Sequence, residues 1–159
     1  MTTAQFPTAL PTTVDGHTLG DIGTCGIGEE VAALGIDRPL TVGEAAERLG
    51  LSVHTLRWYE RIGLLEQVGR DSAGHRRYTA DDIEWLLLLI RLRATGMPVK
   101  DMISYAEMVR LGSHTSPERR RLLEEHRARV AEHISALTRD LRTIDYKINA
   151  YRANERAVS

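Results

Sequence analysis

The stretch from His54 to Tyr78 carries the side chains of this sequence best suited to hold phosphate groups. It contains five arginines against three acids, together with two histidines. Guanidinium groups bind phosphate oxygens through paired hydrogen bonds, and hydroxyl, indole and imidazole groups add further donors. A solvated arginine face is an equal alternative on charge alone. The candidate nucleic-acid contacts are Thr41, His54, Thr55, Arg57, Trp58, Tyr59, Arg61, Arg70, His75, Arg76, Arg77, Tyr78 and Lys100.

Two short helices must position the first of these side chains. Thr41 is suited to cap a helix over 42–49, in which apolar residues recur at 3.6-residue spacing and which ends at Gly50. Ser52 is suited to cap a second helix over 53–62, which ends at Gly63. A helix pair joined by a three-residue turn favours a helix-turn-helix, although short helix pairs also occur in other helical proteins.

A hairpin is predicted after the helix pair. Segments 66–68 and 76–78 flank a polar turn over 69–74 that is rich in Gly, Asp and Ser. The arginines of the second segment would then lie beside the second helix. A helix pair followed by a hairpin indicates a winged helix-turn-helix.

The remainder of the chain reads as helical. Thr79 and Asp82 form a capping box for a helix to about residue 95, with apolar side chains on two faces. Pro98 opens the next helix, which Gly112 closes, and the longest helix runs from about Ser116 past Tyr151. The sequence therefore predicts a mainly α fold.

The last helix carries an apolar seam. Its positions recur at alternating intervals of four and three, which is the pattern of a coiled coil. A rod of roughly 57 Å, at about 1.5 Å per residue, is too long for so small a domain to cover. No second helix of similar length exists, so we expect homodimerisation, with parallel and antiparallel pairing both left open by the heptads. The seam residues are Val130, Ile134, Leu137, Leu141, Ile144, Ile148 and Tyr151.

Length and charge divide the 159 residues into three segments. Residues 1–39 hold one Arg against five acids and six of the thirteen glycines, which favours a flexible acidic leader. This leader masks the basic character of the remainder, since the whole chain has a formal net charge of -1. We expect a DNA-binding domain over 40–112 and a dimerisation helix with a short tail over 113–159.

Composition also bears on location and class. The longest apolar run, Trp85–Ile90, is far shorter than the roughly 20 residues that cross a bilayer, and the first residues lack the features of a secretory signal. We therefore expect a cytoplasmic protein. The single cysteine, Cys25, excludes an intrachain disulfide and a zinc finger within one subunit.

Three strings closely resemble the DNA-binding domain of the MerR family of transcription regulators. They are LTVGEAAERL at 40–49, LSVHTLRWYERIGLL at 51–65 and GHRRY at 74–78, and the resemblance extends over 40–151. It includes a second wing at Gly96–Val99. Trp58 departs from the family, which usually has Tyr there; the change loses a phenolic hydroxyl and keeps an indole donor.

The resemblance implies a dimer with antiparallel last helices and two recognition helices in successive major grooves of a palindromic operator. By motif, Arg57, Trp58 and Tyr59 would grip or buttress the DNA backbone, and Arg76 and Tyr78 would do so from the wing. His54 and Thr55 would be best placed for base edges. Family members lie in an overlong spacer between promoter elements and, on binding an effector, distort the DNA so that RNA polymerase engages both elements.

The resemblance does not identify the effector to which this chain would respond. Metal sensors of the family use cysteines near the dimer helix, and this chain has none after residue 25, so we expect no metal or other cofactor. Further motifs resemble a stress-response subgroup that reacts with aldehydes and thiol-reactive electrophiles, but Arg91 stands where that subgroup has its sensing cysteine. His126 and His133 share a helix face and are expected to be solvated. A small-molecule effector is unknown, and control by abundance or by a partner on the leader stays open.

Two other classes of protein are alternatives. An enzyme is disfavoured, because no Ser-His-Asp arrangement, phosphate-binding Gly loop or metal-ligand cluster is present in the sequence. The stronger alternative is a coiled-coil protein-interaction module or an architectural DNA-bending protein without a dedicated effector. Steep salt dependence of binding would favour DNA over a largely apolar protein contact.

Overall fold

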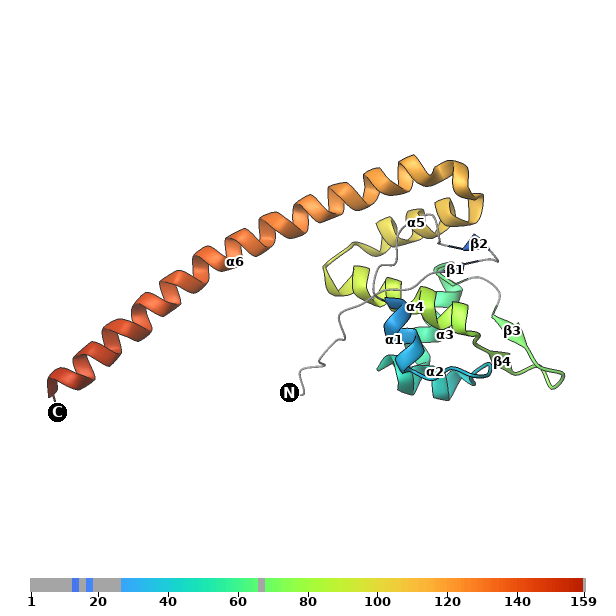
Figure 1. The fold of residues 1–159 in the computed structure, drawn as a ribbon, viewed down its shortest axis with the longest axis horizontal. Coiled ribbons are helices and arrows are strands. Elements are labelled where there is room, and N and C mark those ends of the chain that lie inside the picture. Colours follow the sequence, from blue (N-terminus) through green and yellow to red (C-terminus); the bar gives the residue numbers. More distant parts are fainter. Residues whose placement is uncertain (1–12, 15–16, 19–26, 66–67, 159) are drawn as a thin grey trace. The chain divides into compact units, whose positions relative to one another are not determined.

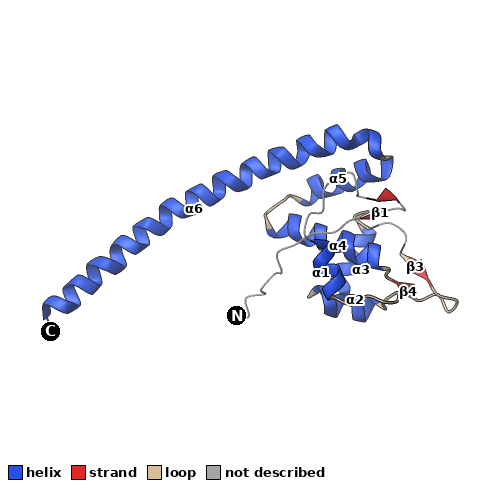
Figure 2. Ribbon diagram, in the orientation of Figure 1, coloured by secondary structure: helices blue, strands red, loops and turns tan. Residues whose placement is uncertain are grey.

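The computed structural model describes residues 13–14, 17–18, 27–65 and 68–158. The chain forms two compact units, Met1–Leu111 and Gly112–Ser159, which we call the N-terminal and C-terminal units. Figure 1 shows the order of the elements, and Figure 2 shows that helices dominate both units. The mainly α fold predicted from the sequence is confirmed.

The predicted helix pair is present, with the predicted caps. Helix α2, Val42–Leu49, begins at Thr41, whose hydroxyl accepts from the Glu44 amide while the Glu44 carboxylate accepts from the Thr41 amide. It ends at Gly50, whose φ of 64° is in the left-handed region that glycine adopts readily. Helix α3, Val53–Arg61, begins at Ser52, whose hydroxyl accepts from the Thr55 amide at 3.0 Å.

The hairpin is present, but its first strand is displaced from the prediction. Strand β3 is Gly69–Arg70 and strand β4 is Arg76–Arg77, paired antiparallel with Gly69 opposite Arg77. The predicted strand 66–68 is therefore wrong at Val68, and residues 66–67 lie outside the described residues. Asp71 accounts for the shift, because its carboxylate accepts from the amides of two later residues and closes a tight turn directly after Arg70.

A backbone bridge joins the start of the helix pair to the end of the hairpin. The Leu40 amide donates to the Tyr78 carbonyl and the Tyr78 amide donates to the Leu40 carbonyl, both at 2.8 Å. Both side chains are buried, at 1% and 0% exposed. The helix pair and the wing are therefore parts of one folded unit.

Helix α4, Ala80–Ala94, supplies the centre of the N-terminal unit. It begins with the predicted capping box of Thr79 and Asp82, and it buries side chains on two faces. The Trp85 indole donates to the carbonyl of Leu64 at 2.6 Å, and its ring stacks at 6.0 Å on Tyr105 of α5, Val99–Leu111. This one side chain connects the end of the helix pair to α5.

The expected flexible leader differs from the structure over residues 27–39. Ile27–Ala33 form helix α1, whose Ile27 is fully buried and whose Glu30 carboxylate pairs with Arg91 of α4. Strands β1, Thr13–Val14, and β2, His17–Thr18, form an antiparallel pair. The short amphipathic pattern of α1 was hidden by the glycines and acids around it, because composition averages over such a segment.

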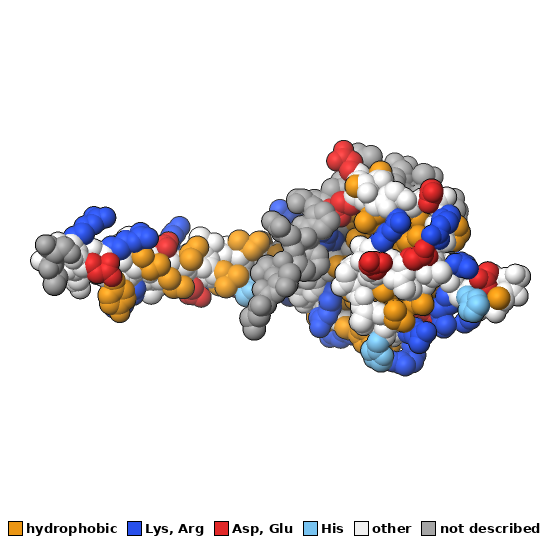
Figure 3. All heavy atoms as spheres, turned by 90° about the horizontal axis from the view of Figure 1, so that it is seen from below, with side chains coloured by type: hydrophobic (Ala, Val, Ile, Leu, Met, Phe, Trp, Pro, Cys, Tyr) orange, Lys and Arg blue, Asp and Glu red, His pale blue; other side chains and the backbone are white. Residues whose placement is uncertain are grey.

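The C-terminal unit is a 3-10 turn, Ser113–Thr115, followed by helix α6, Ser116–Val158. Large apolar side chains along α6 are exposed, as Figure 3 shows. The expectation that His126 is solvated is wrong: it is 6% exposed and shares a buried face with Arg119, while His133 is exposed. Across the described ranges, no helix is long and apolar enough to span a membrane.

The packing of α1 predicts the effect of truncating its buried anchor. I27A should lower the free energy of unfolding by about 2 to 5 kcal/mol, because it removes apolar contacts and leaves a cavity. E29A, at an exposed position of the same helix, should change it by less than about 0.5 kcal/mol. Urea unfolding measures both, and equal stabilities of the two variants would show that α1 does not pack as described.

Candidate nucleic-acid interface

The exposed face of α3 is basic. His54, Arg57 and Arg61 are exposed and recur at intervals of three and four, which places them on one face of the helix. The opposite face is buried through Leu56 and Tyr59. The geometry therefore turns the cations of α3 outward on a helix that the core holds in place, and Figure 3 shows Lys and Arg side chains gathered along one edge of the N-terminal unit.

The remaining α3 candidates lie lower on the helix surface. Thr55 is half-buried, and its hydroxyl lies 2.8 Å from the Ser52 hydroxyl. Trp58 is also half-buried, with its ring centroid 5.5 Å from that of Tyr59 at an interplanar angle of 45°. The two rings of Trp58 and Tyr59 are therefore in contact with each other.

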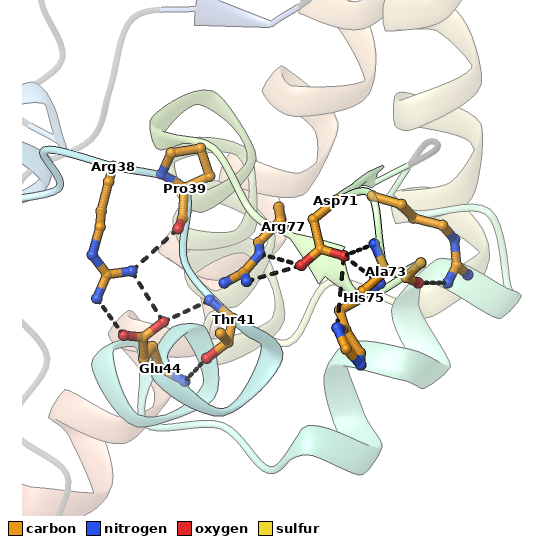
Figure 4. Close-up of polar contacts among 10 residues, drawn as sticks. Arg38, Pro39, Thr41, Glu44, Asp71, Ala73, His75 and Arg77 are labelled. Atoms are coloured by element: carbon orange, nitrogen blue, oxygen red, sulfur yellow. Dashed lines mark hydrogen bonds and ion pairs between the residues drawn. The ribbon is translucent and has the colours of Figure 1, made fainter.

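The wing turn is organised by one carboxylate. Asp71 accepts from the amides of Ala73 and His75 and from the guanidinium of Arg77, as Figure 4 shows. The His75 amide is the largest cause of the lowered pKa of Asp71, and Arg77 lowers it further. Arg70 donates to the Gly74 carbonyl at 2.7 Å. The wing is therefore a preorganised turn that presents Arg70 and His75 to solvent.

A second carboxylate fixes the wing to α3. Glu60 of α3 accepts from the Tyr78 hydroxyl through Oε1 and from Nε of Arg76 through Oε2, each at 2.6 Å. Burial raises the pKa of the Tyr78 phenol, and the bond to Glu60 raises it further. Sequence reasoning did not identify Glu60; the available signal was a lone acid between Arg57 and Arg61.

Two of the expected contact residues are largely buried. Tyr59 is 4% exposed and Tyr78 is 0% exposed. Aromatic rings of this size stabilise a small core more than they would a solvated surface. This burial is compatible with the buttressing that the resemblance implies for both residues.

The last two candidates lie at helix starts. Thr41 is half-buried at the N-terminus of α2, where its hydroxyl is engaged by the Glu44 amide. The Glu44 carboxylate also binds the Arg38 guanidinium, as Figure 4 shows. This hydrogen bond from Arg38 is the largest cause of the lowered pKa of Glu44, which is about 2. Lys100 is exposed in the first turn of α5.

The apolar seam of α6 is largely exposed. Val130 is half-buried, and the other six seam residues are between 41% and 65% exposed, which is unusual for side chains of this kind. They are Ile134, Leu137, Leu141, Ile144, Ile148 and Tyr151. Among the described residues, no group of three or more His, Cys, Asp or Glu could hold a metal ion.

Comparisons with known proteins agree with this arrangement. A model of the MerR HTH family regulatory proteins matches residues 40–108, and a model named MerR, DNA binding, matches residues 83–146. An uncharacterised HTH-type transcriptional regulator of Haemophilus influenzae is 43% identical over 111 residues, covering 70% of this chain and 82% of the relative.

Solved structures give the same result. The chain is similar to the crystal structure of HiNmlR, a MerR family regulator lacking the sensor domain, bound to promoter DNA. That match has a TM-score of 0.68 and 40% identity over 76% of this chain and 96% of the other. A MerR family regulator from Listeria monocytogenes also has a TM-score of 0.68, with 35% identity over 70% of this chain and 85% of that one.

The contact between Glu60 and Tyr78 predicts a measurable energetic coupling. E60A should destabilise the protein, because it leaves a buried hydroxyl without its acceptor, whereas Y78F removes both the hydroxyl and the need for one. In a double-mutant cycle by urea unfolding, the two changes should couple by about 1 to 2 kcal/mol. Additive effects would mean that the hydroxyl does not depend on Glu60.

Proposed function

Because the chain belongs to the MerR family of helix-turn-helix regulatory proteins, we propose that it is a DNA-binding transcription regulator that binds a palindromic promoter site as a homodimer. The single observation that carries this proposal is the exposed basic face of α3 beside the preorganised wing. The promoter-DNA complex of the similar HiNmlR supports the same ligand class.

In this proposal α3 enters the major groove, which is about 12 Å wide and admits one helix. His54, near the N-terminus of α3, reaches base edges, since side chains in the first turn of a recognition helix point into the groove. Arg57 and Arg61 bind phosphates, because their guanidinium groups are exposed on the same face and form no ion pair among the contacts of the described residues.

The wing binds the adjacent backbone. Arg70 and His75 are its exposed basic side chains, although His75 Nδ1 also lies 3.6 Å from Asp71 Oδ1. Arg76 and Arg77 are less exposed and are held by Glu60 and Asp71, so they offer less positive charge. Fixing these side chains before binding lowers the entropy lost when the complex forms. The wing therefore positions the protein on DNA more than it selects a sequence.

The exposed seam of α6 supports homodimerisation. Six exposed apolar side chains spaced at heptad intervals would bury their surface against the same seam of a second copy. The two recognition helices would then be linked by a pair of helices, so that a change in dimer geometry alters the DNA between the half-sites. In this scheme the distorted promoter is what RNA polymerase engages.

Substitution on α3 separates backbone from base contacts. R57A should weaken binding to all sequences about equally and reduce the salt dependence of log K by about 0.9, because one phosphate contact is lost. H54A should mainly change base preference, by about 1 to 3 kcal/mol at one position. Fluorescence anisotropy at several salt concentrations measures both.

R142A is the matched control for R57A, since it removes the same charge from an exposed position of α6. Its salt slope should equal that of the wild type. If R57A kept the wild-type salt slope, α3 would not be the DNA-binding helix. In a separate footprinting experiment, protection scattered along the DNA would favour the architectural alternative.

Charged substitutions in the apolar seam of α6 should convert the dimer into a monomer. L137D combined with I144D should yield a monomer in sedimentation velocity, because two carboxylates would be buried in an apolar interface. S135D combined with T143D adds the same charge outside the seam and should leave the dimer intact. A dimer that survives the seam substitutions would place the interface elsewhere.

A further inference from the structure

The N-terminal unit contains a cavity that the DNA-binding account does not use. It has a volume of about 190 Å³ and lies between α1, α2 and α4. Leu49, Leu87 and Ile90 form its apolar wall, and Glu30, Arg48 and Arg91 supply its charged groups. Mostly apolar walls with a few placed polar groups are typical of small-molecule sites.

The volume restricts the size of a ligand. Drug-sized molecules occupy pockets of about 300 Å³ or more, whereas an apolar cavity of about 150 Å³ in an engineered protein binds benzene. A space slightly larger than that accommodates one ring or a short branched chain together with one small polar group. The cavity is therefore suited to a ligand of about ten heavy atoms.

The charged groups restrict its chemistry. Two arginines and one acid face the cavity, so the lining has a formal charge of +1 and favours an anion over a cation. One guanidinium nitrogen of Arg91 donates to both carboxylate oxygens of Glu30, at 2.7 and 2.9 Å. The Arg48 guanidinium donates to the carbonyls of Leu34 and Gly35. The cavity thus already holds one carboxylate at Arg91.

We propose that this cavity binds a small apolar carboxylate, which replaces the Glu30 carboxylate on Arg91. The side chains of Arg91 and Glu30 are 21% and 9% exposed, so removing the Glu30 carboxylate with no replacement would be costly. A ligand carboxylate keeps that charge paired, while its apolar body covers Leu87 and Ile90. Glu30 is then displaced, and α1 loses one of its attachments to α4.

A ligand in this cavity would contact helices of the DNA-binding unit. One wall belongs to α2, the first helix of the helix pair, and another belongs to α4, which packs beneath it. The third wall, α1, lies before residue 40, where the match to the family model begins. Glu30, whose carboxylate is exchanged, therefore lies outside the segment that matches the family model. The proposed ligand site does not depend on the DNA-binding proposal.

Benzoate and benzamide test the site directly, because they share a shape and differ in charge. In methyl and amide NMR of the full chain, benzoate should cause saturable shifts at Leu87 and Ile90. Benzamide should bind at least tenfold more weakly. Benzoate should also speed hydrogen exchange of the Leu34 amide, which lies directly after α1 and donates to the Glu30 carbonyl at 3.0 Å. Equal binding of the two probes, or no saturable shift, would overturn the proposal.

Variants distinguish exchange with Glu30 from a purely structural ion pair. E30Q should bind benzoate several-fold more tightly, because a neutral amide competes less for Arg91. R91Q should bind it at least tenfold more weakly and lose the preference over benzamide. R93Q, the same change on an exposed position of α4, should match the wild type. Weaker binding by E30Q than by the wild type would contradict the exchange.

One further variant leaves the ion pair untouched. A33L enlarges a side chain at the exposed rim of the cavity and should weaken benzoate binding by occupying its volume. Wild-type affinity in A33L would show that benzoate binds outside the cavity. DNA affinity, measured in parallel, reports on the regulator proposal alone.

Discussion

The arrangement of the DNA-binding unit depends on Tyr78. Its backbone pairs with Leu40 at the start of the helix pair, and its hydroxyl binds Glu60 on the recognition helix. Because Tyr78 directly follows strand β4, this one residue joins the start of the helix pair, α3 and the wing. Glu60 extends the connection by holding Arg76. A buried tyrosine whose hydroxyl has a hydrogen-bond acceptor can therefore set the geometry of a neighbouring surface.

The sequence allowed most of the elements to be predicted, because their signals are local. Caps at Thr41, Ser52 and Thr79 and heptad spacing along α6 act within a few residues of the chain, and the structure has each of them. Long-range partners were not predictable in this way. The hydrogen bond between Glu60 and Tyr78 joins residues that are 18 apart in the sequence. The ion pair that attaches Glu30 of α1 to Arg91 of α4 joins residues that are 61 apart.

The same distinction applies to the candidate site. Residue type identified the exposed cations of α3, but it could not distinguish them from Arg76 and Arg77, whose charges are paired by carboxylates. Nor could it show that Tyr59 and Tyr78 are buried. The folded basic motif thus contains both exposed cations and cations that are paired with carboxylates.

We expect this chain to bind a palindromic promoter site as a dimer. Footprinting of the purified protein on its own upstream region, with transcription in vitro from the same template, tests it most directly. We expect protection of one palindrome whose half-sites lie a whole number of helical turns apart, about 34 Å each, and a change in transcription. Absence of a protected palindrome at every protein concentration would contradict it.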